Sequence, residues 1–459
     1  MRRRTLIRDA ETAGEFAADA YVYLYPLVLM DAMRRQMTNV ASAGEIVGRA
    51  PPNVFAQVPH LRASGCRDIA RASPGALHSS AWLDVSSEPV IVSVPDAGDG
   101  YYLLPMFDMW SDLVAVPGTR TSGNWPADYA VVGRGWDGEL PARVRRIDAP
   151  TPYLWVVGHV QQGCRCSDDF RSGMTVTPLS HRGGARGRPD DARRRARPDL
   201  DSSAPAVELV DAMAAEEFFT RGAELMSLHP PHVHDHAVLQ RIERVGITPG
   251  EPFESGRLPN AVSGALPAAV ARSRFDLHRR WNRLGRERNG WRVHAGSMGA
   301  WGTDYLKRAA VARFSPGAVM PEDVVQCVSR PLDGRHGFTL RFPPQGAPPV
   351  IAFWSLTAYD EDGFVVPNEL DRYALGSRDE LEFGSDGSLE LAIRHRAPAD
   401  GSTTNWLPCP PGRFELCLRL YRPEREMFDD AWAPPPVVRQ ELPVSSPPRV
   451  HTATGGRRR

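Results

Sequence analysis

The fold is constrained most by short β-rich runs, separated by turn residues, in two distant parts of the chain. From Ala81 to Val160 these runs include EPVIVSVPD, YYLLPMFDMW and TPYLWVVGHV. The same pattern returns from Phe338 onward, in FTLRF, VIAFWSLTAYD and GRFELCLRLYRP. The 42 prolines and 40 glycines favour many short strands over long helices. We therefore predict an α+β protein with two mainly antiparallel domains of β-sandwich or jelly-roll type.

Helical patterning occupies the N-terminus and the stretch between the two β-rich blocks. Thr12 and Glu15 form a capping-box pattern at the start of an amphipathic helix that contains Pro26. Between the β blocks, VDAMAAEEFFTRGAELMSL and YLKRAAVARF repeat apolar residues at helical spacing. Pro230 and Pro231 should end the first of these helices. We expect a helical bridge between the two β domains.

Composition divides the chain further, because 459 residues are too many for one ordinary core. Residues 163–203 are rich in Arg, Gly, Asp and Pro and poor in apolar residues, which predicts a mobile linker. The predicted segments are a flexible N-terminus (1–11), a helical and β-rich domain (12–162), a disordered linker (163–204), a helical bridge (205–325), a second β domain (326–435) and a loose tail (436–459).

Charge and hydropathy argue against two classes of partner. The formal net charge is zero, so no overall field attracts nucleic acid or anionic lipid. The basic run RGRPDDARRRAR contains aspartates and no aromatic residues, which is typical of a solvated loop. The apolar segment from Tyr21 to Met30 is too short to span a bilayer, and the six scattered cysteines fit a reducing compartment. We predict a cytoplasmic protein that binds neither nucleic acid nor membranes.

The nearest approach to a metal motif is HPPHVHDH, residues 229–236. A di-zinc site of the H-x-H-x-D-H type follows a strand, whereas His232, His234, Asp235 and His236 are one residue short of it and follow a predicted helix. Neighbours in one extended loop cannot all point at one ion. We interpret the motif as a polar connection between helices, with adventitious metal binding as the alternative. We predict no metal ligands and no cofactor.

Longer sequence blocks are more specific than any catalytic motif. FWSLTAYDEDGFVVPNELDRYALGSRDEL, DGSLELAIRHRAP and NWLPCPPGRFELCLRLYRP closely resemble the bacterial domain-of-unknown-function (DUF) family 1214. AYVYLYPLV, SSAWLDVSSEPVIVSVPD and YYLLPMFDMWSDLVAVPGTRTSG resemble its usual N-terminal companion, family 1254. Together, the similar blocks cover most of residues 15 to 435. The resemblance implies two β-rich domains with helical additions, and it implies no settled activity.

The chain departs from these families in three places. SPGALHSSAWLD replaces the usual Asn-x-Asp-Thr-Leu-Tyr block, so that His78 stands in place of the tyrosine. His159 stands where an arginine is usual at the end of the WVVG strand, and the linker from residue 163 is poorly matched. If the missing carboxylate is a general acid or base in the families, its chemistry is lost here or has moved to His78. The families usually have a proline-rich connection without histidine ligands in place of HPPHVHDH, which agrees with a structural role for that motif.

Polar and aromatic residues within the apolar strand blocks are the candidates for a binding site. Aromatic rings can stack on a sugar or terpenoid face, while Arg and Asn side chains fix its polar groups. Alternatively, the rings are core and interdomain packing, and Arg372 satisfies a buried carbonyl or carboxylate. The predicted substrate-binding residues are Arg120, Trp354, Tyr359, Asn368, Arg372, Tyr373, Asn405 and Trp406.

We predict a metal-independent small-molecule enzyme of the lyase, hydrolase or cyclase type, using acid–base residues in a cleft between the domains. The predicted catalytic residues are His78, Asp108 and Asp360. Two alternatives remain: a module that binds a carbohydrate or other small organic ligand without chemistry, and a structural protein that assembles into homo-oligomers. An enzyme should contain a buried acid or base with a shifted pKa, whereas an assembly protein should present a large apolar interface.

Overall fold

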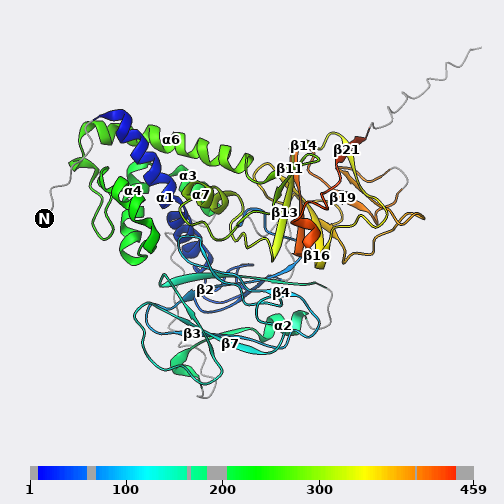
Figure 1. Cartoon of the computed structure of the whole chain (residues 1–459), viewed down its shortest axis with the longest axis horizontal. Coiled ribbons are helices and arrows are strands. Elements are labelled where there is room, and N and C mark those ends of the chain that lie inside the picture. The colour runs from blue at the N-terminus through cyan, green and yellow to red at the C-terminus, as the bar shows by residue number, and fades with distance from the viewer. Residues whose placement is uncertain (1–8, 59–68, 163–166, 183–203, 399–400, 441–459) are drawn as a thin grey trace, which may run out of the picture.

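The computed structural model describes residues 9–58, 69–162, 167–182, 204–398 and 401–440. These residues form an α+β fold whose sheets are mainly antiparallel, as predicted. Figure 1 shows a group of helices beside two β domains, the N-terminal one in blue to teal and the C-terminal one in yellow to red. Within this part of the chain, no helix is both long and apolar enough to cross a membrane.

The helical group is built around α1 (Ala10–Met37), which contains Pro26 and is buried along most of its length. Five further helices pack on α1: α3 (Ala206–Ala212), α4 (Ala215–Leu228), α5 (His236–Glu243), α6 (Asn260–Asn282) and α7 (Tyr305–Phe314). The predicted capping box is wrong, because the N-cap is Asp9, whose carboxylate accepts the backbone N–H of Thr12. Three residues earlier, Asp9 supplies the same kind of cap that the sequence suggested at Thr12.

The N-terminal β domain consists of two facing sheets. The larger one has the order β1 (Ala56–Val58), β2 (Leu77–Asp84), β9 (Tyr153–Val160), β5 (Met106–Phe107) and β6 (Leu113–Ala115), with β4 (Tyr102–Leu103) also paired to β9. The other has the order β10 (Thr175–Pro178), β3 (Val90–Val94), β7 (Ala127–Val132) and β8 (Arg145–Asp148). Apolar residues such as Leu83, Val92, Val131 and Leu154 form the core of this domain.

Part of the predicted linker is ordered. Residues 167–182 form α2 (Ser167–Gly173), β10 and the short 3₁₀ helix η1 (Leu179–His181), and β10 pairs with β3 along its length. Phe170 and Met174 anchor this segment, since both side chains are buried in the core of the domain. The remaining predictions for the linker, for residues 1–8 and for the tail beyond residue 440 concern residues outside the described ranges.

The C-terminal β domain also has two sheets. The larger has the order β11 (Arg286–Arg288), β12 (Trp291–His294), β13 (Val324–Ser329), β20 (Arg413–Pro423), β16 (Val350–Asp360) and β17 (Ala374–Gly376), with β14 (Leu332–Asp333) beside β20. The smaller has the order β19 (Trp406–Pro408), β18 (Leu389–Arg394), β15 (Gly337–Phe342) and β21 (Val437–Gln440). Trp354 and Tyr359 join different apolar clusters, as their opposite parity in β16 requires.

The two β domains meet in a packed seam. The rings of Phe353 and Tyr421 stack with centroids 4.1 Å apart, and Tyr101 of the N-terminal domain meets both edge-on. The buried hydroxyl of Tyr359 donates to the carbonyl of Ala72 at 2.7 Å and accepts from Arg419 at 2.7 Å. These contacts join the C-terminal domain to the loop that precedes β2.

Candidate functional site

An acidic turn of the N-terminal β domain provides the first part of the site. Asp108 follows β5, and its side chain is fully buried. One carboxylate oxygen accepts the backbone N–H groups of Trp110 at 2.9 Å and Asp112 at 3.0 Å, which fixes the turn between β5 and β6. The other oxygen is directed at the helical bridge, and Asp112 lies on the same turn.

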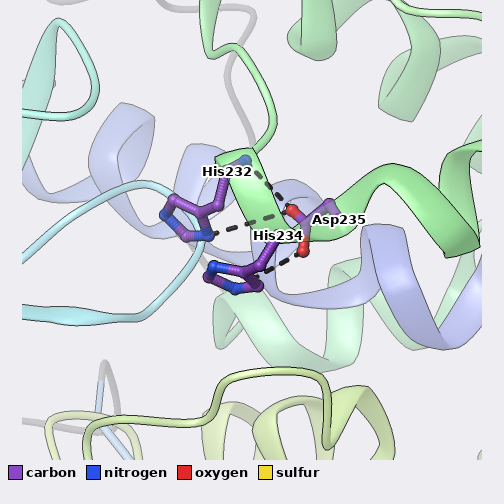
Figure 2. Close-up of side chains that lie close together, drawn as sticks. All are labelled: His232, His234 and Asp235. Atoms are coloured by element: carbon purple, nitrogen blue, oxygen red, sulfur yellow. Dashed lines mark hydrogen bonds and ion pairs between the residues drawn. The ribbon is translucent and has the colours of Figure 1, made fainter.

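The histidine-rich motif provides the second part. It forms the 3₁₀ helix η2 (Val233–Asp235), which the Asp235 carboxylate closes by accepting the N–H of His232 at 3.0 Å. Figure 2 shows the rings of His232 and His234 side by side, with the Asp235 carboxylate next to them. The prediction that an extended loop would separate these side chains is therefore wrong, because one tight helical turn brings them together.

A hydrogen bond joins the two parts. Nε2 of His232 lies 2.6 Å from the second carboxylate oxygen of Asp108. A carboxylate only accepts, so Nε2 carries the proton and Nδ1 of the neutral ring is bare. Nδ1 is buried without a hydrogen-bond partner among the described residues, 3.8 Å from Asp112 and 3.9 Å from Asp235. Burial opposes protonation of His232, but its bond to Asp108 and the carboxylate charges outweigh burial and raise its pKa.

Asp112 is the least strongly held carboxylate of the cluster. Burial raises the pKa of Asp112, and the neighbouring Asp108 carboxylate raises it further. The opposing cation is Arg308, which is fully buried and lies 3.3 Å from the Asp112 carboxylate. The site thus combines an imidazole and a carboxyl group whose pKa values are both shifted upward, which is the pattern expected of proton-transfer groups.

Asp235 is anchored by two tyrosines from different helices. The hydroxyl of Tyr23 in α1 donates to Asp235 at 2.8 Å, and that of Tyr305 in α7 donates to it at 2.9 Å. Burial and the Asp235 charge raise the pKa of both hydroxyls, so they remain donors at neutral pH. The site is therefore assembled from α1, the β5–β6 turn, η2 and α7.

The cluster reaches the surface on the side of the histidines. His232 retains 14% and Asp112 18% of their side-chain exposure, whereas His234 retains 47%. Tyr305 also lines a groove of about 610 Å³ between α1, α5, α6 and α7. Val22 and Leu306 are among the other residues that line this groove. The tyrosine thus connects the acidic cluster with a cavity large enough for a small organic molecule.

Two overlapping sets of side chains could hold a metal ion. They are His232, His234 and Asp235, and Asp108, Asp112 and His232, with the ligand atoms of each set within 4.8 Å of one another. The first set fits better, since Asp108 already bonds Nε2 of His232 while Nδ1 has no partner. Imidazole and carboxylate donors of this kind suit Zn²⁺, and three protein ligands would leave one position open.

Of the predicted catalytic residues, the structure places only Asp108 in this cluster. His78 lies at the seam, with Nε2 2.6 Å from the carbonyl of Ser73, and burial lowers its pKa to about 4. Asp360 ends β16, where its carboxylate accepts the backbone N–H groups of Asp362 and Phe364. His78, Asp108 and Asp360 are thus held by three different sets of contacts.

Three predicted substrate-binding residues line a common cavity. Trp354, Arg372 and Tyr373 border a space of about 520 Å³ at the seam, together with Gly75 of the N-terminal domain. Arg372 already donates to the backbone carbonyls of Thr403 and Trp406, as the alternative reading of that residue anticipated. This cavity is the part of the junction that most resembles the predicted interdomain cleft.

The other predicted binding residues make internal contacts. Arg120 forms a bidentate ion pair with Asp323, and Tyr359 bonds Ala72 and Arg419 as described above. Asn368 accepts the N–H groups of Leu370 and Arg372, and Asn405 holds the backbone of Glu382. Trp406 is buried and donates to the carbonyl of Arg394.

Sequence reasoning did not single out most of the site. His232 and Asp235 were assigned to a structural connection, and Tyr23, Asp112, Tyr305 and Arg308 were not selected at all. The available signal was an excess of ionisable residues in HPPHVHDH and in the turn FDMWSD. Only the fold shows that these two segments, 124 residues apart at Asp108 and His232, touch.

Comparisons with known proteins agree with this architecture. Residues 317–425 match the family model described as Protein of unknown function (DUF1214), and residues 52–177 match that of Protein of unknown function (DUF1254). No curated protein matches the chain.

Two solved structures are similar. The crystal structure of the VPA0106 protein from Vibrio parahaemolyticus has 20% sequence identity and a TM-score of 0.63, covering 94% of this chain and 100% of that one. A putative uncharacterized protein from Burkholderia cenocepacia has 11% identity and a TM-score of 0.43, covering 94% and 93%. The first supports the fold alone. By its two family matches, this chain is a protein that combines a DUF1254 region with a DUF1214 region.

Proposed function

We propose that the chain is a small-molecule enzyme that works by proton transfer at the cluster of Asp108, Asp112, His232 and Asp235. The observation that supports this most is the 2.6 Å bond from Asp108 to His232, which leaves the buried Nδ1 of the imidazole bare. An oriented imidazole with one free nitrogen is a general base, and its paired carboxylate stabilises the imidazolium that forms.

The two shifted groups provide complementary steps. Nδ1 of His232 takes a proton from the substrate or from a water molecule, and the resulting positive charge faces Asp112 and Asp235. Asp112, whose pKa is raised, can return a proton to the leaving or newly formed group. Arg308 beside Asp112 and Tyr305 beside Asp235 hold these two carboxylates in position. This order of proton transfers suits lyase, hydrolase or cyclase chemistry, and it uses only the chain's own acid–base groups.

The substrate class follows from the surroundings of the site. We place the approach on the side of the half-exposed His234 and of the groove that Tyr305 lines. The groove is lined by apolar side chains, including Val22 and Leu306, and by charged ones, including Arg241 and Asp276. A small organic molecule with an apolar body and a polar group fits such a surface.

A comparison of matched histidine variants tests this proposal. Purified protein is incubated with a fractionated metabolite extract, and consumption of each compound is followed by mass spectrometry. We expect a compound that the unaltered chain and His236→Asn both consume and that His232→Asn and Asp108→Asn do not. His236 is the control, because it lies in the same motif but is exposed and its ring bonds Gln240 rather than the acidic cluster.

Two outcomes would contradict the proposal. Consumption that is equal in His232→Asn and in the unaltered chain would show that the imidazole has no part in the reaction. Loss of consumption after treatment with a chelator, restored by Zn²⁺, would replace proton transfer by His232 with chemistry at a metal held by His232, His234 and Asp235.

The seam cavity supports a second candidate function, the binding of a small polar ligand without chemistry. The observation in its favour is the buried hydroxyl of Ser355, which lines the cavity and has no hydrogen-bond partner among the described residues. Trp354 and Tyr373 supply ring surface beside it. A small molecule released from the denatured chain, but absent from a Ser355→Phe variant that fills the cavity, would support binding at the seam. Equal recovery from both would exclude this location.

A further inference from the structure

A third cavity lies where the helical bridge joins the C-terminal β domain. It has a volume of about 240 Å³ and lies between the end of α6, the hairpin β11–β12, α7 and the segment after β20. Its lining includes His294 in β12, Lys307 in α7, and Arg286 and Arg288 in β11. The cavity is smaller than a typical site for a drug-sized ligand.

His294 is the unusual residue of this cavity. The side chain is 3% exposed, and neither ring nitrogen has a hydrogen-bond partner in the described part of the chain. Burial, together with the charges of Arg292 and Arg71, lowers the pKa of His294 to about 3, so the ring is neutral. A neutral imidazole always presents one N–H donor, and leaving such a donor buried and unused is unfavourable. A ligand that accepts this hydrogen would remove the penalty.

The charges around the cavity favour an anion. Arg286 and Arg288 both contact the carboxylate of Asp430 at 2.8 Å, and Lys307 donates to the carbonyl of Ser297. The lining therefore contains three cationic side chains and one carboxylate, which leaves it with an excess of positive charge. Asp430 already occupies the two guanidinium groups in the way that a bound carboxylate would.

The lining also has an apolar portion. Leu284, Val293, Met298 and Met427 border the same space, and all four side chains are buried. A free inorganic anion would gain nothing from these residues, whereas a molecule with a carbon skeleton would bury apolar surface against them. From these observations we infer that this cavity binds a small organic anion. The charged group of the anion faces Lys307 and the arginines, and its carbon body lies against the methionines and the leucine.

Calorimetric titration of the full chain with benzoate, acetate and inorganic phosphate at constant ionic strength tests the inference. Benzoate should bind more tightly than acetate and phosphate, because it alone combines the charge with an apolar body. Lys307→Met should weaken benzoate binding by roughly tenfold or more, as expected for the loss of a charged hydrogen-bond donor. Arg279→Met is the matched control, since Arg279 is an exposed cation on the neighbouring α6, paired with Asp276.

A variant that should bind benzoate more tightly distinguishes an effect on the site from an effect on folding, because a misfolded protein would not gain affinity. Asp430→Asn removes the internal carboxylate that competes for Arg286 and Arg288, and it should tighten benzoate binding. The inference is overturned if none of the three anions binds, if phosphate binds better than benzoate, or if Arg279→Met weakens binding as much as Lys307→Met. It is also overturned if Asp430→Asn leaves the affinity unchanged.

Discussion

His78 and His159 lie directly opposite each other on β2 and β9, with their ring centroids 4.7 Å apart. Burial is the main cause of a lowered pKa for both rings, to about 4 for His78 and well below the usual range for His159. Arg419 adds a positive charge close to both. The seam between the domains thus contains two neutral imidazoles that resist protonation.

This pair should make the chain sensitive to mild acid. As the pH falls below about 6.5, His78 takes up a proton in the unfolded chain, whereas in the folded chain it stays neutral down to about pH 4. The unfolded state therefore gains stability over that interval, by up to about 3 kcal/mol for a shift of this size. Urea unfolding of the unaltered chain should show this loss between neutral pH and pH 4. His78→Gln should lose less stability over the same interval, and an equal loss in both would contradict the assignment.

The ion pair of Arg120 and Asp323 should stabilise the fold. Asp323 has a side-chain exposure of 2% and accepts two hydrogen bonds from the guanidinium group, at 2.7 and 2.8 Å. Arg120→Leu would leave this buried carboxylate unpaired. Because Arg120 is about a third exposed, we expect a loss of about 2 kcal/mol in the free energy of unfolding rather than the full cost of a buried pair.

An exposed pair in the same domain gives the control for that measurement. Arg146 and Asp148 are 2.8 Å apart and both largely solvated, so Arg146→Leu should change the stability by less than about 1 kcal/mol. The double variant of Arg120→Leu with Asp323→Leu should recover part of the loss. If the two arginine substitutions destabilise equally, the buried pair has no special role.

Gly75 permits a close approach between the two β domains. A Cβ atom at this position would lie 2.4 Å from Cβ of Ser355 and 2.6 Å from its hydroxyl. Gly75→Ala should therefore reduce the stability by about 1–3 kcal/mol, as overpacking does elsewhere. Ser355→Gly should restore it in the double variant, whereas Ser355→Ala should not, because alanine retains the clashing Cβ. If both substitutions restored the stability, the contact between positions 75 and 355 would have room for the added methyl group.

The pattern of apolar and turn residues predicted the α+β architecture and the sites of α1, α4 and α7, but it did not single out α6. Trp354 and Tyr359 lie in different apolar clusters, because side chains alternate between the two faces along a strand. Residues 167–182 were assigned to a linker, since their composition is polar and few apolar side chains, among them Phe170, Met174 and Val176, hold them to the core. A few apolar anchors among many polar neighbours do not produce a periodic signal.

The candidate site was harder to predict, because its parts are distant in sequence. Asp108 was selected as a catalytic residue and does belong to the cluster, but its partner His232 was assigned to a polar connection. The error came from treating HPPHVHDH as extended, whereas Asp235 closes it into a 3₁₀ turn. No local pattern could have indicated that Tyr23 and Tyr305 hold Asp235 from two other helices.

The sharpest test of the proposed proton transfer at the cluster is the titration of His232. Nitrogen-15 NMR of labelled histidines reports both the pKa of the ring and the nitrogen that carries the proton. We predict for His232 a pKa above the usual 6.5, a neutral form with the proton on Nε2, and a pKa that falls in Asp108→Asn. A His232 ring that titrates at or below 6.5 and is unaffected by Asp108→Asn would show that the bond to Asp108 does not prepare His232 as a base.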